Sequence, residues 1–372
     1  MSGSNSCLGS FGGLSAGMDA ERKRYFRERR LFALQVESTD ACRQGCLYCY
    51  SGSTPTERAA LTSNEIRCVL DAAATLGVRA IDWLGGDPLE RPDWHDLMVH
   101  ARTRGLRNNL WTSGLPLRDP EVAARVLDAT EGGFVSVHVD SMDPRTYAAL
   151  HRGGDARNIA RIVEGVDLLL ARGKPAHQMM NCITFTALQS PEDAIETMRW
   201  WSAEKGMRTC LTMFNPAGMR ADAWALEPKP EATRLVYQER DGINFSDGQV
   251  SIAAMDTDKF YCGTMATVTS AGDVTPCSVI RDGVGNIRMT PFSRIVAEQL
   301  GMLTHAALHD THTMPAPCDS CHNNSHCWGC RASAYHYGGD ANGLDPKCWL
   351  IHGVQLPESK PQAGQPVIWR KA

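Results

Sequence analysis

The sequence predicts an α/β fold: a partial barrel of six β-then-α units, a (β/α)6 arrangement of the TIM type, followed by a small cysteine-rich region. Two observations predict it. Strand-like and helix-like segments alternate up to about residue 214, which is typical of parallel sheets with crossover helices. The chain also has 14 cysteines, most of them in close clusters that indicate metal or redox chemistry rather than a disulfide scaffold.

The β-then-α units follow one another in a regular order. Strands are expected at residues 31–39, 79–84, 106–112, 134–140, 178–186 and 208–214, and helices at 63–76, 94–104, 119–129, 159–170 and 191–203. The first helix has Ser63 as its expected cap and carries Ile66, Val69 and Leu70 on one face. Ligands of such barrels bind at the C-terminal ends of the strands, so the segments after the strands are the candidate site.

Five regions are expected along the chain: an N-terminal extension (1–30), the barrel (31–215), a linker (216–254), the cysteine-rich region (255–352) and a tail (353–372). The formal net charge is -4, without the basic footprint of a nucleic-acid binder. The sequence has no apolar run long enough to span a membrane, and its first residues lack the pattern of a secretory signal. We therefore expect a cytoplasmic protein that binds neither nucleic acid nor membrane.

The first cysteine cluster directly follows the first expected strand. Cys42, Cys46 and Cys49 have the spacing C-x3-C-x2-C. Three thiolates on one short loop can hold three irons of a four-iron cluster and leave the fourth iron open to a chelating small molecule. A zinc knot is the alternative, but it needs a fourth ligand, and none follows nearby.

This loop resembles the signature of the radical S-adenosylmethionine (SAM) superfamily. The resemblance implies that a 4Fe-4S cluster on the three cysteines binds SAM, and that one electron cleaves SAM to a 5′-deoxyadenosyl radical, which removes a hydrogen atom from substrate. It also implies SAM contacts from motifs after the later strands: Gly85, Gly86, Asp87, Pro88, Ser113, His138, Asp140, Arg152 and Asn181. Two departures stand out, because Asp87 replaces the usual Glu and His138 stands where Ser is usual.

The second cysteine cluster has the spacing C-x14-C, then C-x2-C-x5-C-x2-C, then a single cysteine. Its order resembles the SPASM domain, an extension that carries two auxiliary 4Fe-4S clusters in many radical SAM enzymes. The resemblance assigns Cys318, Cys321, Cys327 and Cys348 to an outer cluster, and Cys262, Cys277 and Cys330 to an inner one. The fourth inner ligand stays open: Asp256 or Asp258 could supply it, or substrate could bind the open iron. Two structural zinc sites are the alternative for these cysteines.

The remaining four cysteines and a group of three histidines are expected to be structural rather than functional residues. Cys7, Cys68, Cys182 and Cys210 are expected to be ordinary buried residues. The histidines at 305, 309 and 312 have helical spacing and are expected on a solvated helix face.

The resemblance covers about residues 31–350 and implies a radical SAM oxidoreductase or maturase. We expect cross-linking, decarboxylation or dehydrogenation of a ribosomal peptide. Modification of haem-precursor propionates, or oxidation of another small molecule, is the alternative, and a non-catalytic iron–sulfur carrier is a third. Sulfatase maturation is disfavoured because Ser278, rather than Asp, follows Cys277. A flavodoxin- or ferredoxin-type protein would supply electrons. A separate protein would recognise a leader peptide, because no winged-helix module is visible in the sequence.

Overall fold

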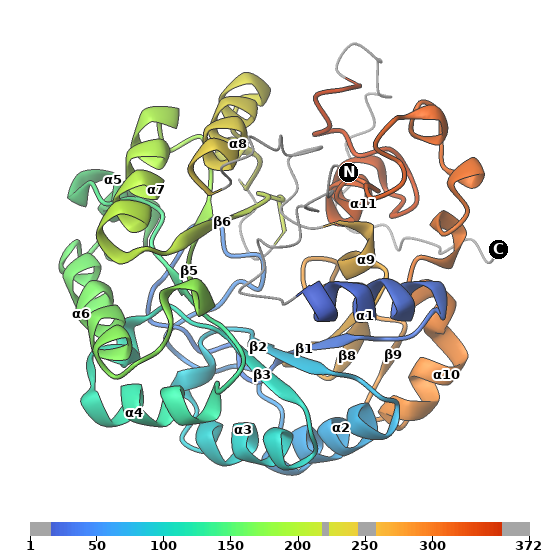
Figure 1. The fold of residues 1–372 in the computed structure, drawn as a ribbon, viewed down its shortest axis with the longest axis horizontal. Coiled ribbons are helices and arrows are strands. Elements are labelled where there is room, and N and C mark those ends of the chain that lie inside the picture. The colour runs from blue at the N-terminus through green and yellow to red at the C-terminus, as the bar shows by residue number, and fades with distance from the viewer. Residues whose placement is uncertain (1–15, 218–222, 245–257, 352–372) are drawn as a thin grey trace.

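The computed structural model describes residues 16–217, 223–244 and 258–351. Its centre is a nine-stranded sheet in the order β6-β5-β4-β3-β2-β1-β7-β8-β9 (Figure 1). The strands are β1 (Ala33–Glu37), β2 (Ala80–Leu84), β3 (Arg107–Trp111), β4 (Val135–His138), β5 (Met179–Thr184), β6 (Arg208–Thr212), β7 (Met265–Val268), β8 (Asp273–Thr275) and β9 (Gly285–Asn286). The strands β1 to β6 pair in parallel, as the alternating pattern predicts.

Helices connect the parallel strands and cover the outer face of the sheet, as Figure 1 shows. The α-helices are α1 (Ala16–Arg27), α2 (Ser63–Thr75), α3 (Trp94–Thr103), α4 (Pro120–Ala129), α5 (Pro144–Leu150), α6 (Arg157–Ala171), α7 (Pro191–Lys205), α8 (Pro230–Asn244), α9 (Lys259–Cys262), α10 (Phe292–Leu303) and α11 (Arg331–Gly338). The predicted partial barrel is therefore confirmed. In detail, the cap of α2 is Thr62 rather than Ser63, because Thr62 and Glu65 form a reciprocal capping box.

The main core lies between the sheet and these helices. Leu34, Val36, Ile81 and Trp83 on β1 and β2 are at most 1% exposed, and they pack with apolar residues of the surrounding helices. Burial of each such side chain contributes roughly 1.5–3 kcal/mol. This core fixes the positions at which the parallel strands end, and those ends carry the predicted site.

The segment 216–254, expected to be a linker, instead contains α8. This helix packs against α7 and β6, and its Val236 and Tyr237 are at most 1% exposed. Charged residues between the apolar positions of α8 hide its period in the sequence. It covers β6 as the sixth helix of the series. The other parts of the expected linker, 218–222 and 245–257, lie outside the described residues, as do 1–15 and 352–372.

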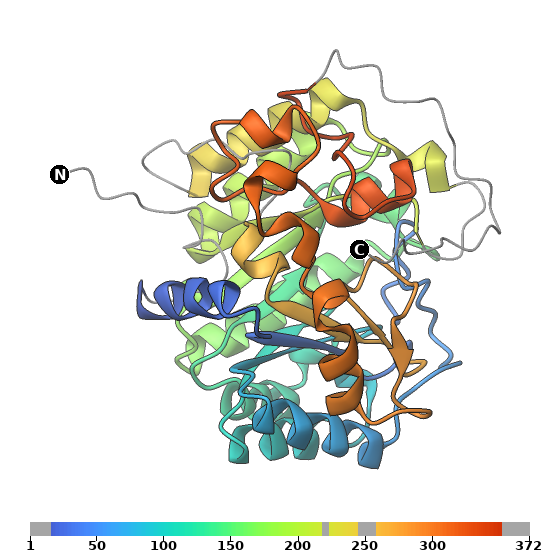
Figure 2. The same ribbon diagram turned by 90° about the vertical axis from the view of Figure 1, so that its right-hand side faces the viewer.

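The cysteine-rich region continues the barrel sheet instead of starting a separate one. β7 pairs in parallel with β1, from Ala33 opposite Met265 to Val36 opposite Val268, and β8 and β9 follow in antiparallel order. In a six-unit barrel β1 would be an edge strand with unpaired backbone groups, and β7 satisfies them. Figure 2 shows β7 to β9 and α10 beside the barrel, with the segment that ends in α11 above them.

The sheet does not close into a ring. Within the described residues its outer strands are β6 and β9, which do not pair with each other. α9 and α11 lie across from β6 in Figure 1, and a cavity is lined from both sides. Over the same described ranges, no helix is long and apolar enough to cross a membrane.

Candidate active site

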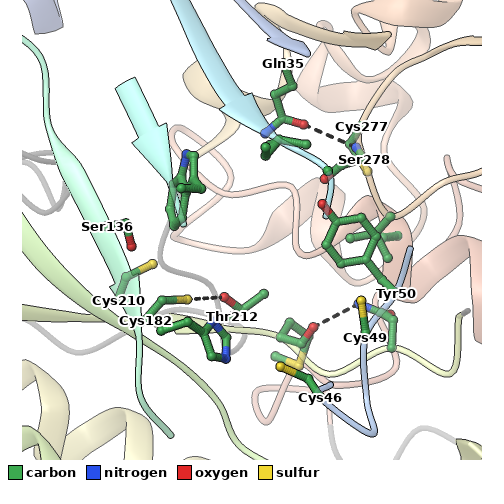
Figure 3. Close-up of a pocket in the computed structure, with 18 of the residues that line it drawn as sticks. Gln35, Cys46, Cys49, Tyr50, Ser136, Cys182, Cys210, Thr212, Cys277 and Ser278 are labelled. Atoms are coloured by element: carbon green, nitrogen blue, oxygen red, sulfur yellow. Dashed lines mark hydrogen bonds between the residues drawn. The ribbon is translucent and has the colours of Figure 1, made fainter. Parts of the chain in front are cut away.

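One cavity of about 320 Å³ lies at the C-terminal ends of the parallel strands. It is lined by residues from the loop after β1, from the ends of β2 to β6, and from α9 and α11. Six of the predicted cluster cysteines share this lining: Cys42, Cys46, Cys49, Cys262, Cys277 and Cys330. The first three lie in the N-terminal loop and the last three in the cysteine-rich region. The fold thus brings the loop cysteines and the predicted inner set to one space (Figure 3).

A second cavity of about 410 Å³ is lined by the other four predicted cluster cysteines: Cys318, Cys321, Cys327 and Cys348. The two cavities therefore divide the seven SPASM-type cysteines into the same outer and inner sets that the resemblance assigns. Four thiols around one space fit a four-iron cluster, which takes one thiolate on each iron. Within the described ranges, no three His, Cys, Asp or Glu side chains converge to hold a single metal ion.

Backbone hydrogen bonds shape the loop that carries the first three cysteines. The Cys42 N–H donates to the Thr54 carbonyl at 2.8 Å, and the Arg152 N–H donates to the Gly45 carbonyl at 2.8 Å. Gly45 has φ +76°, and a Cβ there would lie 3.1 Å from the Arg152 carbonyl oxygen. A residue without a side chain is needed at this turn. The loop is thereby held against the segment after α5.

Burial raises the pKa of three of the predicted cluster thiols in this cavity. It raises the pKa of Cys42 and of Cys277 to about 12 and raises the pKa of Cys46 well above its usual range. The neighbouring Asp140 carboxylate raises the pKa of the Cys46 thiol further. Iron binds the thiolate, so loading of these sites must release protons to solvent.

Two glycines after β2 let that strand approach the cysteine loop. The Gly86 N–H donates to the Thr39 carbonyl at 2.7 Å, and the Asp87 N–H donates to the Ala41 carbonyl at 2.7 Å. A Cβ at Gly85 would lie 2.5 Å from the Thr39 carbonyl oxygen. Both glycines line the main cavity. Their backbone is therefore in reach of a ligand that occupies it.

Asp87 lies behind the cavity wall rather than in it. Its carboxylate accepts hydrogen bonds from the Thr112 hydroxyl at 2.8 Å, the Ser113 hydroxyl at 2.5 Å and the Leu89 N–H at 3.0 Å. It is 0% exposed and does not line the cavity, whereas Thr112 and Ser113 do. In this geometry Asp87 orients Ser113, and the predicted contact of Asp87 with SAM stays a prediction.

His138 lines the cavity above a buried polar network. The Tyr48 hydroxyl lies 2.7 Å from His138 Nε2 and also donates to Asp140, whose Oδ1 is 3.1 Å from the same imidazole nitrogen. Burial alone would lower the pKa of His138, but the Asp140 carboxylate raises it well above its usual range. Burial would likewise raise the pKa of Asp140, which His138 and His151 lower overall. The floor of the cavity is thus an imidazolium–carboxylate pair.

The other residues predicted to contact SAM do not line this cavity. Asn181 makes two hydrogen bonds, at 2.9 and 2.8 Å, with the backbone of Val139. Arg152 is exposed, and its backbone supports the cysteine loop. Pro88 starts a short 3-10 helix (Pro88–Glu90), and Asp140 lies beneath His138. Gly85, Gly86, Ser113 and His138 are therefore the predicted SAM contacts that the cavity brings together.

Cys182 and Cys210 are buried as expected, but they also line the main cavity. They face each other on the paired strands β5 and β6, and Figure 3 shows both beside Thr212, whose hydroxyl lies 2.9 Å from Cys182 Sγ. The Cys210 thiol and then the charged His138 lower the pKa of Cys182 to about 5. On the neighbouring strand β4, the polar residues Ser136 and His138 alternate and also line the cavity. Cys68 was expected to be buried and is exposed, while Cys7 lies outside the described residues.

The expectation of a solvated histidine face is wrong for His305. α10 ends at Leu303, and His305 caps a separate 3-10 helix, Ala306–Leu308. His305 is 3% exposed and lines the main cavity with the inner set of cysteines. Of the two aspartates considered as ligands, Asp258 caps α9 by accepting from the Tyr261 N–H at 3.0 Å, and Asp256 lies outside the described residues.

Comparison with known proteins identifies relatives of the whole described fold. A family profile described as "Radical SAM superfamily" matches residues 36–201. A PqqA peptide cyclase of Streptomyces rochei is 30% identical over 346 residues, which cover 85% of this chain and 88% of that protein. An AdoMet-dependent heme synthase of Methanosarcina barkeri is 25% identical over 340 residues, covering 84% of this chain and 94% of that protein.

Solved structures share the fold at low identity. SuiB of Streptococcus suis, bound to S-adenosylmethionine, matches with a TM-score of 0.64 at 16% identity, over 91% of this chain and 84% of that chain. The protein anSMEcpe, with bound AdoMet and a peptide, matches with a TM-score of 0.59 at 15% identity, over 81% of this chain and 90% of that chain. These structures share the overall fold with this chain.

Proposed function

Because this chain belongs to the radical SAM superfamily, with the cysteine pattern of its SPASM members, we propose that its main cavity is where SAM is cleaved and a ribosomal peptide is oxidised. One observation carries the proposal: the loop cysteines and the inner SPASM-type cysteines line a single cavity. A substrate in that cavity would contact the SAM site on one side and the inner set on the other.

The loop cysteines and the residues at the ends of β2 to β4 would have different roles in binding. Cys42, Cys46 and Cys49 would hold three irons of a 4Fe-4S cluster. When bound, this cluster supplies one electron to SAM, whose homolysis provides the radical that abstracts hydrogen. The backbone of Gly85 and Gly86 and the Ser113 hydroxyl would bind the polar part of SAM. The charged His138 would orient a hydroxyl or carboxylate at the opposite side.

Two auxiliary 4Fe-4S clusters complete the proposed cofactor set. The outer cavity supplies four thiols, and the main cavity supplies three for the inner cluster. When bound, these clusters would take up the electron that remains on the substrate after hydrogen abstraction. A flavodoxin- or ferredoxin-type donor would deliver electrons, and a separate protein would present a leader peptide.

A peptide is the favoured substrate because the relatives and neighbours include peptide-binding enzymes. The name PqqA peptide cyclase states a peptide substrate, and SuiB has been solved bound to its precursor peptide SuiA. The cavity between β6 and α11 is lined mostly by small or apolar groups, such as Leu211, Met213 and Ala332, which suits an amino-acid side chain.

Haem-precursor modification is the second candidate, because an AdoMet-dependent heme synthase is among the relatives. The two are separated by one experiment. The holoenzyme is incubated anaerobically with SAM and reductant, together with either a candidate precursor peptide or a haem precursor. We expect 5′-deoxyadenosine formation to be stimulated by the peptide, whose mass falls by two hydrogens or by a carboxyl group. Stimulation by the tetrapyrrole alone would reject the peptide proposal.

A further inference from the structure

The predicted inner cluster lacks one ligand. Cys262, Cys277 and Cys330 line the main cavity, and no other SPASM-type cysteine does. Four irons need four ligands unless one iron is open. The aspartate that the structure describes, Asp258, does not line the cavity, and its carboxylate caps α9. Asp256 lies outside the described residues. Among the described residues, a different side chain must therefore supply the fourth donor if the site is closed.

His305 lines the same cavity as the three cysteines. Its ring packs edge-on against Trp328, with centroids 6.1 Å apart, and Trp328 also packs in the apolar cluster against which Cys262 rests. The imidazole is thus placed in the neighbourhood of the inner cysteines, although His305 is far from each of them in sequence.

The imidazole of His305 has a buried ring nitrogen with nothing to bind. The residue is 3% exposed, and within the described ranges Nδ1 has neither a hydrogen-bond partner nor contact with solvent. A buried polar atom without a partner is costly, so native proteins rarely leave one unless it has a further role. Imidazole nitrogen is a good donor to iron and replaces cysteine in some iron–sulfur centres.

The backbone of His305 is also unusual. It has φ 51° and ψ 50°, the left-handed region that residues with a Cβ seldom adopt. The conformation turns the chain sharply between α10 and the next 3-10 helix, and it directs the ring inward. Such strain persists where the surroundings hold it, and it clusters at functional sites.

We infer that His305 is the fourth ligand of the inner auxiliary cluster, through its imidazole. This inference rests on the proposed auxiliary clusters and goes beyond them by naming the missing donor. It names a donor in place of Asp258, and it closes the iron that substrate would otherwise bind. A neutral imidazole in place of a thiolate leaves the cluster one charge less negative, which raises its reduction potential.

The test uses anaerobically reconstituted full-length enzyme that carries 15N-labelled histidine. Pulsed electron paramagnetic resonance of the reduced protein detects nitrogen bound to a cluster, and the isotope separates histidine from the SAM amino group. The variants are His305→Ala and His305→Cys, and the matched control is His309→Ala. His309 also contacts Trp328, but its Nε2 is engaged with the Thr304 carbonyl at 3.0 Å and it does not line the cavity.

We expect an isotope-sensitive histidine coupling in the wild type and in His309→Ala, and its loss in both His305 variants. His305→Cys keeps a four-ligand site, so it should retain wild-type iron content and shift the inner cluster to a lower potential. A wild type with about twelve irons but no histidine coupling, or a coupling that survives in His305→Ala, would overturn this assignment alone. Iron near four per chain would overturn the auxiliary clusters themselves, and with them the proposed cofactor set.

Discussion

The close approach of β2 to the cysteine loop gives the sharpest prediction, through Gly86→Ala. A Cβ at Gly86 would lie 2.5 Å from the carbonyl carbon of Ala41 and 2.7 Å from that of Asp40. Ordinary contact between carbon atoms is about 3.5 Å. The added methyl group therefore forces the loop that carries Cys42 to retreat by about 1 Å. The φ of Gly86 lies outside the left-handed region, so the effect is purely steric.

The cost follows from the contacts that this retreat disrupts. It breaks the hydrogen bonds from the Gly86 and Asp87 N–H groups to Thr39 and Ala41, both 2.7 Å long. Two such bonds are worth about 1 kcal/mol each, and overpacking adds about 1–3 kcal/mol. The free energy that favours the closed loop should fall by about 3 kcal/mol or more. Because 1.4 kcal/mol is a factor of ten in an equilibrium constant, the equilibrium between the closed and the displaced loop should shift by about a hundredfold.

The assay is 5′-deoxyadenosine formation from SAM by the reduced holoenzyme, with iron content measured in parallel. Gly86→Ala should lower the rate by about a hundredfold or more. The matched control is Gly338→Ala, because Gly338 is helical and a Cβ there meets nothing within 4 Å; it should leave the rate unchanged. A Gly86→Ala protein with wild-type iron and a wild-type rate would refute this reasoning about the loop.

Three further predictions concern other parts of the molecule. The Cys210 thiol and His138 lower the pKa of Cys182 to about 5, so its thiolate should be fully present at pH 7. The rate at which iodoacetamide labels Cys182, followed by mass spectrometry, should then be flat between about pH 6 and 8. A labelling rate that rises only above pH 8 would contradict this expectation. Arg281 contacts the buried Glu37 carboxylate at 2.5 and 3.0 Å, so Arg281→Ala should lower the free energy of unfolding in urea by about 3 kcal/mol. The double variant Arg281→Met/Glu37→Gln removes both charges and should recover part of this stability. If the double variant recovered none, the ion pair would not explain the loss. Cys327→Ala should remove about four irons and leave SAM cleavage in place, and a full loss of cleavage would show that the outer set is not a separate site.

Much of the architecture could be predicted from the sequence because the signals were local. The six parallel strands have the predicted order, and their ends fall within a few residues of the expected positions, for example residues 179–184 within the expected 178–186. The resemblance to the SPASM domain implied the division between inner and outer sets, and the two cavities have the same division. A spacing pattern that lies on one short loop predicts its own geometry, because no contact between distant segments is needed to bring its residues together.

What sequence could not predict depends on contacts between distant segments. β5 is buried along both faces, so no alternation of polar residues indicated that Cys182 faces the cavity, and its partner Cys210 is set by the register of β6. His305 was misplaced because α10 ends at Leu303 and His305 itself is left-handed, which the spacing of the histidines does not reveal. The role of Asp87 likewise depends on the hydroxyls of Ser113 and Thr112, which come from the next strand.

We propose that Cys42, Cys46 and Cys49 hold the cluster at which SAM is cleaved. The most direct measurement is 5′-deoxyadenosine formation by anaerobically reconstituted wild type and by the variant in which all three are alanine, with iron counted in both. We expect the wild type to hold about twelve irons and to cleave SAM, and the variant to retain about eight irons and to make no 5′-deoxyadenosine. A variant that still cleaved SAM at the wild-type rate would contradict the proposal.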